Sequence, residues 1–94
     1  MTETQIYQGL LIKGYNEKQS SNLASQLSSL NDGLSQCLSK WLSSGEESDF
    51  EANGFSLVKL MANYKLKYPA ALLSLDWVIK DPEVAVPTIL KGIR

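Results

Sequence analysis

The sequence contains no histidine and only one cysteine among its 94 residues. Without histidine, the commonest general acid or base and the commonest metal ligand are missing, as is the base of Ser-His and Cys-His nucleophiles. A single cysteine, Cys37, permits no intrachain disulfide, and a zinc site needs several cysteines or histidines. We therefore expect no metal, no cofactor and no enzymatic activity. An enzyme would have to use carboxylate, tyrosine or lysine groups at a site that the sequence does not reveal.

Phosphate-binding loops and long apolar runs are also missing. Neither G-x-x-x-x-G-K-[ST] nor G-x-G-x-x-G occurs in the chain. The apolar runs are too short to span a bilayer as a helix. The first residues place an acid before an apolar run, where a signal peptide would have a basic region. We expect a cytoplasmic protein with no membrane segment.

Positive charge is not in surplus, because the formal net charge is -1 and the sequence pI is about 5.3. This balance argues against a dedicated nucleic-acid binder, which neutralises phosphates with a basic surface. The charges are uneven: residues 1–58 hold three lysines against seven acids, and residues 59–94 hold six basic residues against three acids. Two halves that attract each other on folding explain this pattern better than head-to-tail association of copies, because exposed charge attraction is weak and screened.

The chain contains several residues that typically begin or end helices. The hydrophobic fraction of 44% and the charged fraction of 20% are ordinary for a folded domain. Thr2 is placed to cap a first helix that Gly14 ends, and Asn16 with Gln19 forms a capping-box pattern. We predict a single all-α domain over residues 1–94, built as a bundle of four to five helices.

A stripe of apolar residues follows the second cap. The steps between its members are 4, 3, 4, 3 and 4 residues, a regular heptad pattern. The turn-like trio Asn31-Asp32-Gly33 lies in its middle, but the hydrophobic phase continues through it. We therefore predict one long helix, about 17–43, packed on an apolar helix at about 70–80. The stripe consists of Leu23, Leu27, Leu30, Leu34, Cys37 and Trp41.

The same stripe is the candidate interaction surface of the chain, through Leu23, Leu27, Leu30 and Leu34. Two copies of the chain can bury such a stripe against each other. The positions that flank it offer no opposite charges to set a register, so the core face of the longest helix is the favoured interpretation. The serine-rich opposite face is either solvent-exposed or an interface, and the sequence does not distinguish these alternatives.

The second half of the chain has its own start and stop signals. Ser44 with Glu47, and Ser48 with Glu51, match capping boxes and predict a short helical turn before Asn53-Gly54. A helix from Phe55 or Ser56 to Lys67 should follow, ended by Pro69.

A more apolar helix should then cover Ala70 to Lys80, with Asp76 and Lys80 paired across one turn. Asp81-Pro82 predicts a further helix start, which Pro87 should interrupt. We expect either a short turn followed by a second one from Pro87, or an extended link at residues 84–86.

The nearest approach to a metal motif lies at Asp49, Glu51, Asn53 and Gly54, which match the first half of an EF-hand loop. The last loop position, which needs a bidentate glutamate, is Leu60. Half a loop supplies too few oxygen ligands, so we expect a solvated acidic loop.

A small basic and aromatic cluster, residues 59–68, is the basis of an alternative function. Lys59, Tyr64, Lys65 and Lys67 would contact a nucleic acid by charge and stacking. Tyr64 and Tyr68 fall on the stripe expected to face the core, which weakens this hypothesis. The favoured function is a small non-enzymatic helical protein-interaction or regulatory module with a protein partner, for which homodimerisation is a natural form. A nucleic-acid-binding protein and an enzyme are the alternatives.

Overall fold

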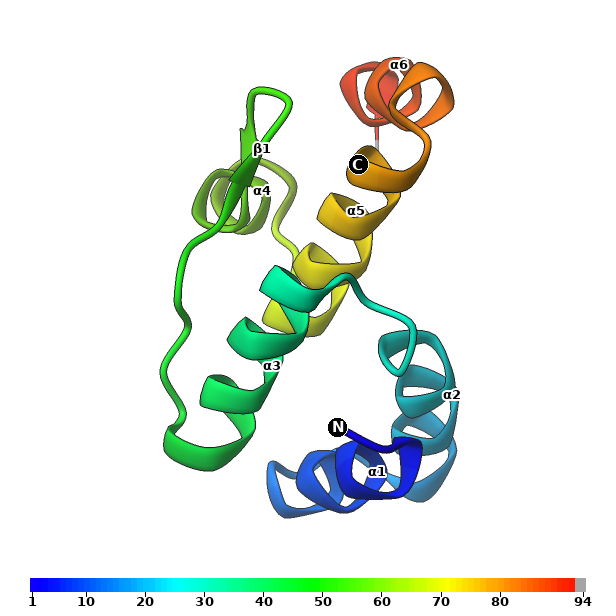
Figure 1. Ribbon diagram of the computed structural model, residues 1–94, viewed down its shortest axis with the longest axis vertical. Helices are drawn as coiled ribbons and strands as arrows, with labels where there is room; N and C mark the ends of the chain where they lie inside the picture. Colours follow the sequence, from blue (N-terminus) through cyan, green and yellow to red (C-terminus); the bar gives the residue numbers. More distant parts are fainter. Residues whose placement is uncertain (93–94) are drawn as a thin grey trace. The chain divides into compact units, whose positions relative to one another are not determined.

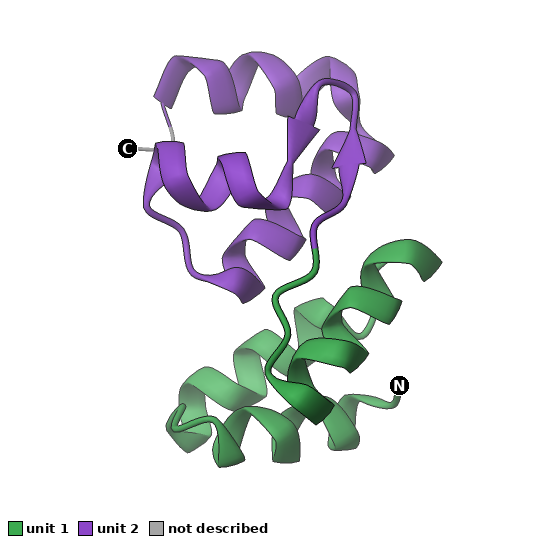
Figure 2. Ribbon diagram, turned by 90° about the vertical axis from the view of Figure 1, so that its left-hand side faces the viewer, with its two compact units in different colours: residues 1–48 green, residues 49–94 purple. Residues whose placement is uncertain are grey.

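The computed structural model describes residues 1–92, and this part of the chain is all-α apart from one short hairpin (Figure 1). It divides into two compact units, residues 1–48 (unit 1) and the residues from Asp49 onward (unit 2) (Figure 2). Within the described residues there are six helices rather than four to five, because the predicted long helix is two helices. None of the helices in this described part is both long and apolar enough to cross a membrane.

The first two helices of unit 1 begin at the predicted caps. Helix α1, Glu3–Ile12, starts with a capping box in which the Thr2 hydroxyl accepts from the Gln5 backbone N–H at 3.2 Å. Gly14, with φ +103, lies in the turn that follows. Helix α2, Glu17–Leu27, starts with a second box, in which Asn16 accepts from the Gln19 N–H at 2.8 Å.

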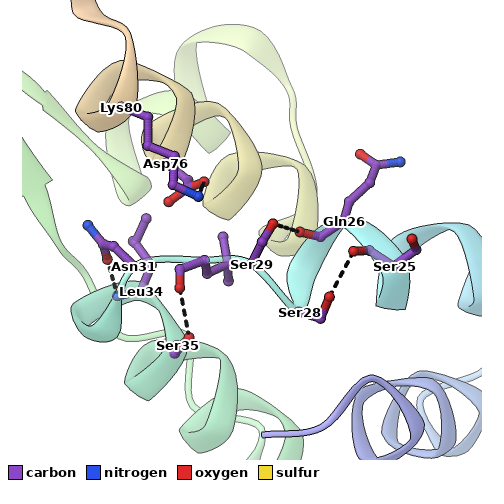
Figure 3. A network of polar contacts seen from close by, with 10 residues as sticks. Ser25, Gln26, Ser28, Ser29, Asn31, Leu34, Ser35, Asp76 and Lys80 are labelled. Carbon is purple, nitrogen blue, oxygen red and sulfur yellow. Dashed lines mark hydrogen bonds and ion pairs between the residues drawn. The ribbon is translucent and has the colours of Figure 1, made fainter.

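The prediction of one helix over 17–43 is wrong. Helix α2 ends at Leu27, and helix α3, Asp32–Ser44, begins after a four-residue link. Asn31 is extended, with ψ 165, and its side chain accepts from the Leu34 N–H at 2.9 Å (Figure 3). This N-cap starts a new helix, and it outweighs the continuous hydrophobic phase.

Unit 1 packs α1 against both α2 and α3. A Cβ atom at Gly9 would lie 2.9 Å from Leu42 Cδ2, so the absence of a side chain allows α1 and α3 to approach closely. Helix α3 ends as predicted at Gly45, which has φ 78 and whose N–H donates to the Trp41 carbonyl. The buried apolar residues of the unit are Ile6, Leu10, Ala24, Leu27, Leu30, Leu34, Cys37, Leu38 and Trp41.

Unit 2 opens with a hairpin where a helical turn was expected. Strand β1, Glu51–Ala52, pairs antiparallel with strand β2, Phe55–Ser56. Asn53 and Gly54 connect them with φ of 50 and 83. Positive φ at both central residues is the type I′ geometry that Asn-Gly favours. The capping-box interpretation of Ser48 and Glu51 is therefore wrong.

Three helices complete unit 2. Helix α4, Leu57–Tyr64, is capped by Ser56 and ends before Lys65, which has φ 55, so its end lies three residues before the predicted one. Helix α5, Tyr68–Lys80, has Pro69 in its first turn, and the predicted Lys80–Asp76 ion pair is present at 2.8 Å.

Helix α6, Pro82–Gly92, runs through Pro87, which corrects the predicted interruption. Proline at this position removes one helical hydrogen bond, at a cost of about 3 kcal/mol in a helix interior. The carbonyl that loses its donor belongs to exposed Glu83 in the first turn, where water can replace the bond. One residue later, the Thr88 hydroxyl donates to the Val84 carbonyl at 2.7 Å.

Helix α5 is the centre of unit 2, because α4, α6 and β1 all pack against it. This position explains why the α5 sequence is apolar on almost every side. The buried apolar residues of the unit are Leu57, Leu60, Tyr68, Ala71, Leu72, Leu75, Val78, Ala85 and Ile89.

Candidate functional site

An open groove of about 360 Å³ lies on unit 2, where the hairpin turn, α4 and α6 meet. This volume is at the lower end of the range for ligand pockets, about 300–1,000 Å³, and suits one or two side chains of a partner. The residues that define it are Asn53, Phe55, Lys59, Tyr64, Val86 and Leu90.

The hairpin side of the groove is held by a side chain of the turn. The Asn53 amide donates to the Val78 carbonyl at 3.2 Å. Val78 lies in the last turn of α5, where the carbonyls have no partner within the helix. The hydrogen bond therefore satisfies an orphan acceptor and fixes the turn, with Phe55 directly after it, against α5.

The α4 side is positioned by two caps at the helix start. The Ser56 hydroxyl accepts from the Lys59 N–H at 3.1 Å, and Asp49 Oδ1 accepts from the Val58 N–H at the same distance. Lys59 and Asn63 follow at i and i+4, so they share one face of α4. Leu60, which is 1% exposed, also lines the groove from this helix.

The α6 side is apolar. Val86 and Leu90 are also spaced by four residues and therefore lie on one face of α6. Val86 is half-buried, whereas Leu90 is 65% exposed. A leucine this exposed next to half-buried Phe55 and Tyr64 gives the groove an apolar edge open to solvent.

Lys59 is the only charged residue among the described residues that line the groove. Its side chain is exposed and forms no ion pair within residues 1–92, whereas Lys80 on α5 is paired with Asp76 (Figure 3). The groove thus offers apolar contact, the amide groups of Asn53 and Asn63, and one cation. This combination suits a partner segment in which an apolar side chain stands next to a polar or acidic residue.

The four residues proposed for nucleic-acid contact separate into two pairs. Lys59 and Tyr64 both line the groove. Lys65 follows the end of α4 and Lys67 precedes the start of α5, and both are exposed outside the residues that line the groove. Tyr68 is 1% exposed, as its place on the core stripe predicts, but Tyr64 is only half-buried.

The four leucines of the candidate interaction surface do not form an exposed stripe. Leu27, Leu30 and Leu34 are 1%, 8% and 0% exposed, and Leu23 is half-buried. They come from α2, the link and α3, so no single helix presents them. Leu27, Leu30 and Leu34 thus belong to the buried interior, Leu23 is partly accessible, and the role of the four leucines as an interaction surface stays a prediction.

Serines near the link make local hydrogen bonds. The hydroxyl groups of Ser28 and Ser29 donate to the carbonyls of Ser25 and Gln26 at 2.9 and 3.1 Å (Figure 3). Such bonds compete with helical ones and are consistent with the end of α2 at this point. These serines are exposed, and their role as an interface stays a prediction.

Two residues of the partial EF-hand pattern, Asp49 and Asn53, form side-chain hydrogen bonds with backbone groups. Asp49 Oδ1 accepts from the N–H groups of Phe50 and Val58, and the Asn53 amide binds Val78. Within residues 1–92, no three Asp, Glu, Cys or His side chains gather as a metal site would require.

One titratable group of unit 1 is perturbed. Burial raises the pKa of the Tyr15 phenol above its usual value of 10.0, and the nearby Glu47 carboxylate raises it further. Lys13 lies in the same unit with its Nζ 5.0 Å from the centre of the Trp41 ring, within cation–π range.

Sequence reasoning missed most of the groove. The Asn53-Gly54 pair was the available signal, because Asn-Gly is the strongest short-range hairpin marker and would have placed Phe55 on a strand. Val86 and Leu90 carried no comparable signal, since an apolar pair four residues apart usually faces a core.

Comparisons of this chain with protein-family models, with curated proteins and with solved structures found no match.

Proposed function

We propose that this chain is a small, non-enzymatic protein-interaction module of the cytoplasm, and that the groove of unit 2 is its binding surface. The observation that carries the proposal is Leu90, which is 65% exposed at the edge of a groove lined by Phe55 and Tyr64. Aromatic residues are enriched in protein interfaces, and clustered exposed apolar groups mark interaction sites.

The energetics favour a partner that inserts an apolar anchor. A few buried anchor residues carry most of the binding energy of an interface, and they fill small, well-defined pockets. Covering Leu90 and the ring of Tyr64 would remove apolar surface from water, at about 25 cal/mol per Å². The hydrogen bond of Asn53 and the caps of α4 hold the groove before binding, which lowers the entropy cost of association.

Selection of a random peptide library on the whole chain tests this function. We expect selected peptides to bind the wild-type protein in calorimetry and to bind Leu90→Glu at least about tenfold more weakly, because a charge at the groove edge opposes an apolar anchor. Val84→Glu is the matched control, since Val84 is 52% exposed on the same helix but is not a groove residue. Equal losses in the two variants, or no selected sequence, would refute the proposal.

Self-association is one form of the same function. Light scattering over a range of concentrations measures it: a dimer that Leu90→Glu dissociates, and that Val84→Glu does not, would identify the groove partner as a second copy.

Nucleic-acid binding is a second candidate because Lys59 and Tyr64 lie together in the groove. Fluorescence anisotropy with generic DNA at low salt, where electrostatic attraction is strongest, is the test. Binding that weakens equally on substitution of Lys59, Lys65 or Lys67 by glutamate would favour this candidate over a protein partner.

A further inference from the structure

We infer that the partner segment carries an acidic residue next to its apolar anchor, and that Lys59 binds this acid. The inference rests on the proposed function and specifies the chemistry of the partner. It starts from the asymmetry of the groove: one wall, from α6, is apolar through Val86 and Leu90, and the wall from α4 presents Lys59 and Asn63.

Charge complementarity points to an acid. Lys59 is the one charge among the described lining residues and makes no ion pair within residues 1–92. Asp49, whose carboxylate binds the first turn of α4, already accepts from the Phe50 and Val58 N–H groups. A carboxylate from a partner would therefore find a lysine with no competing acid among the described lining residues, and the Asn63 amide one turn further along α4.

The same features disfavour a nucleic acid in this groove. A phosphate backbone binds along a row of cations, whereas Lys59 is the one cation among the described lining residues, which also include the apolar Val86 and Leu90. The other lysines of the segment, Lys65 and Lys67, lie beyond the end of α4 and outside the lining.

A second copy is also a weaker choice of partner. The most acidic segment of the chain is Glu46–Glu51, which holds four acids and one aromatic residue, Phe50. The Phe50 carbonyl accepts from the Leu57 N–H at 3.1 Å, and Asp49 binds the start of α4. Presenting this segment to another molecule would break these bonds, so a separate acidic segment is favoured.

The experiment begins with the same random peptide library, selected on wild-type protein and on Lys59→Glu. We expect the wild-type selection to be enriched in Asp or Glu beside an aromatic or aliphatic residue, and the Lys59→Glu selection to lose this acidic preference. A synthetic peptide of the wild-type consensus should bind about tenfold more tightly than its Gln-substituted form at low salt, and this ratio should shrink as salt is added.

Lys65→Glu is the matched control because it makes the same charge change on an exposed lysine outside the groove. It should leave the acid preference intact, while Lys59→Glu removes it and both variants keep the wild-type circular dichroism spectrum.

The outcomes separate the two proposals. A neutral consensus that binds in a Leu90-dependent way overturns the acidic partner and leaves the groove as an interaction surface. If Lys59→Glu and Lys65→Glu reduce the preference for acidic peptides equally, the inference is overturned. The preference would then come from the overall electrostatic field of unit 2 rather than from Lys59. Absence of any selected peptide overturns both.

Discussion

Asn53 has two separate roles in the hairpin turn, and each has its own energetic consequence. Its backbone is in the left-handed region, with φ 50, which asparagine tolerates better than most residues. Its side chain donates to the Val78 carbonyl at 3.2 Å. Asn53→Gly keeps the backbone geometry and removes the hydrogen bond, so we expect a loss of about 1 kcal/mol in the free energy of unfolding.

Asn53→Ala also adds left-handed strain, so it should cost about 1 kcal/mol more than the glycine variant. Urea denaturation of the three proteins measures both differences. Equal stability of the alanine and glycine variants would rule out the type I′ turn, and a wild-type value for Asn53→Gly would show that the bond to Val78 contributes nothing.

Tyr15 gives a prediction about pH. Burial and Glu47 raise the pKa of its phenol in the folded state above the value of about 10 for an unfolded chain. The folded state therefore holds this proton more tightly, so the stability from the neutral phenol is complete below about pH 10 and is lost as pH rises through the folded-state pKa. A Tyr15→Phe variant should lose less stability than wild type over this alkaline range.

Glu47→Gln should lower the pKa of Tyr15 and leave it above the usual value, because burial, the larger cause, remains. A titration of tyrosinate absorbance, with Tyr15→Phe subtracted, measures this shift. Glu46→Gln makes the same charge change one residue away and should leave the titration of Tyr15 unchanged. A Tyr15 pKa that does not respond to Glu47→Gln would contradict the assigned interaction.

At the scale of elements, the break between α2 and α3 explains why hydrophobic phase was a misleading guide. Leu27, Leu30 and Leu34 are all buried, although Leu30 lies in the link and belongs to no helix. A short link that turns back toward the same core keeps its apolar residues inward, so the heptad spacing persists without a continuous helix. The local signal at Asn31, which is the N-cap of α3, carried the correct information.

The N-cap at Asn31 is therefore the feature to test. Asn31→Ala removes the acceptor for the Leu34 N–H, now at 2.9 Å, and should destabilise the chain by about 1 kcal/mol in urea denaturation. Asn31→Asp keeps an acceptor at the cap and should remain within about 0.5 kcal/mol of wild type. An alanine variant as stable as wild type would support a helix that continues through the link.

At the scale of the whole molecule, local and non-local features differed in how well they could be predicted. The caps at Thr2 and Asn16, the end of α3 at Gly45 and the pairing of Asp76 with Lys80 depend on residues at most a few positions apart. Such features can therefore be predicted from the sequence alone. The all-α class follows from such signals and is confirmed.

The groove could not be predicted in the same way, because packing brings its residues together from three elements. Leu90 lies 26 residues beyond Tyr64 in the chain, and no local pattern links Phe55, Tyr64 and Leu90 to one another. The depth to which each is buried depends on how α4 and α6 pack around α5. The sequence pattern points to Lys59 and Tyr64 only as nucleic-acid contacts, and to Asn53, Gly54 and Leu60 only as positions of a partial EF-hand loop.

The division into two units gives the last prediction. Residues 45–50 are in neither helix nor strand, and Glu46 and Glu47 are exposed, whereas the other glutamates of residues 1–92 lie within helices or β1. A protease needs an extended, accessible backbone, so cleavage by a glutamate-specific protease under native conditions should occur first after Glu46 or Glu47.

Mass spectrometry at short times should then show two fragments that meet at this point, and a Glu46→Gln, Glu47→Gln double variant should delay the first cut by at least about tenfold. First cleavage at Glu17 or Glu83 would mean that α2 or α6 opens more readily than the segment between the units. That the whole chain forms a single domain stays a prediction, and the same digestion bears on it. Fragments that remain resistant after the first cut would indicate two units that hold their own structure, whereas rapid loss of both would indicate one cooperative domain.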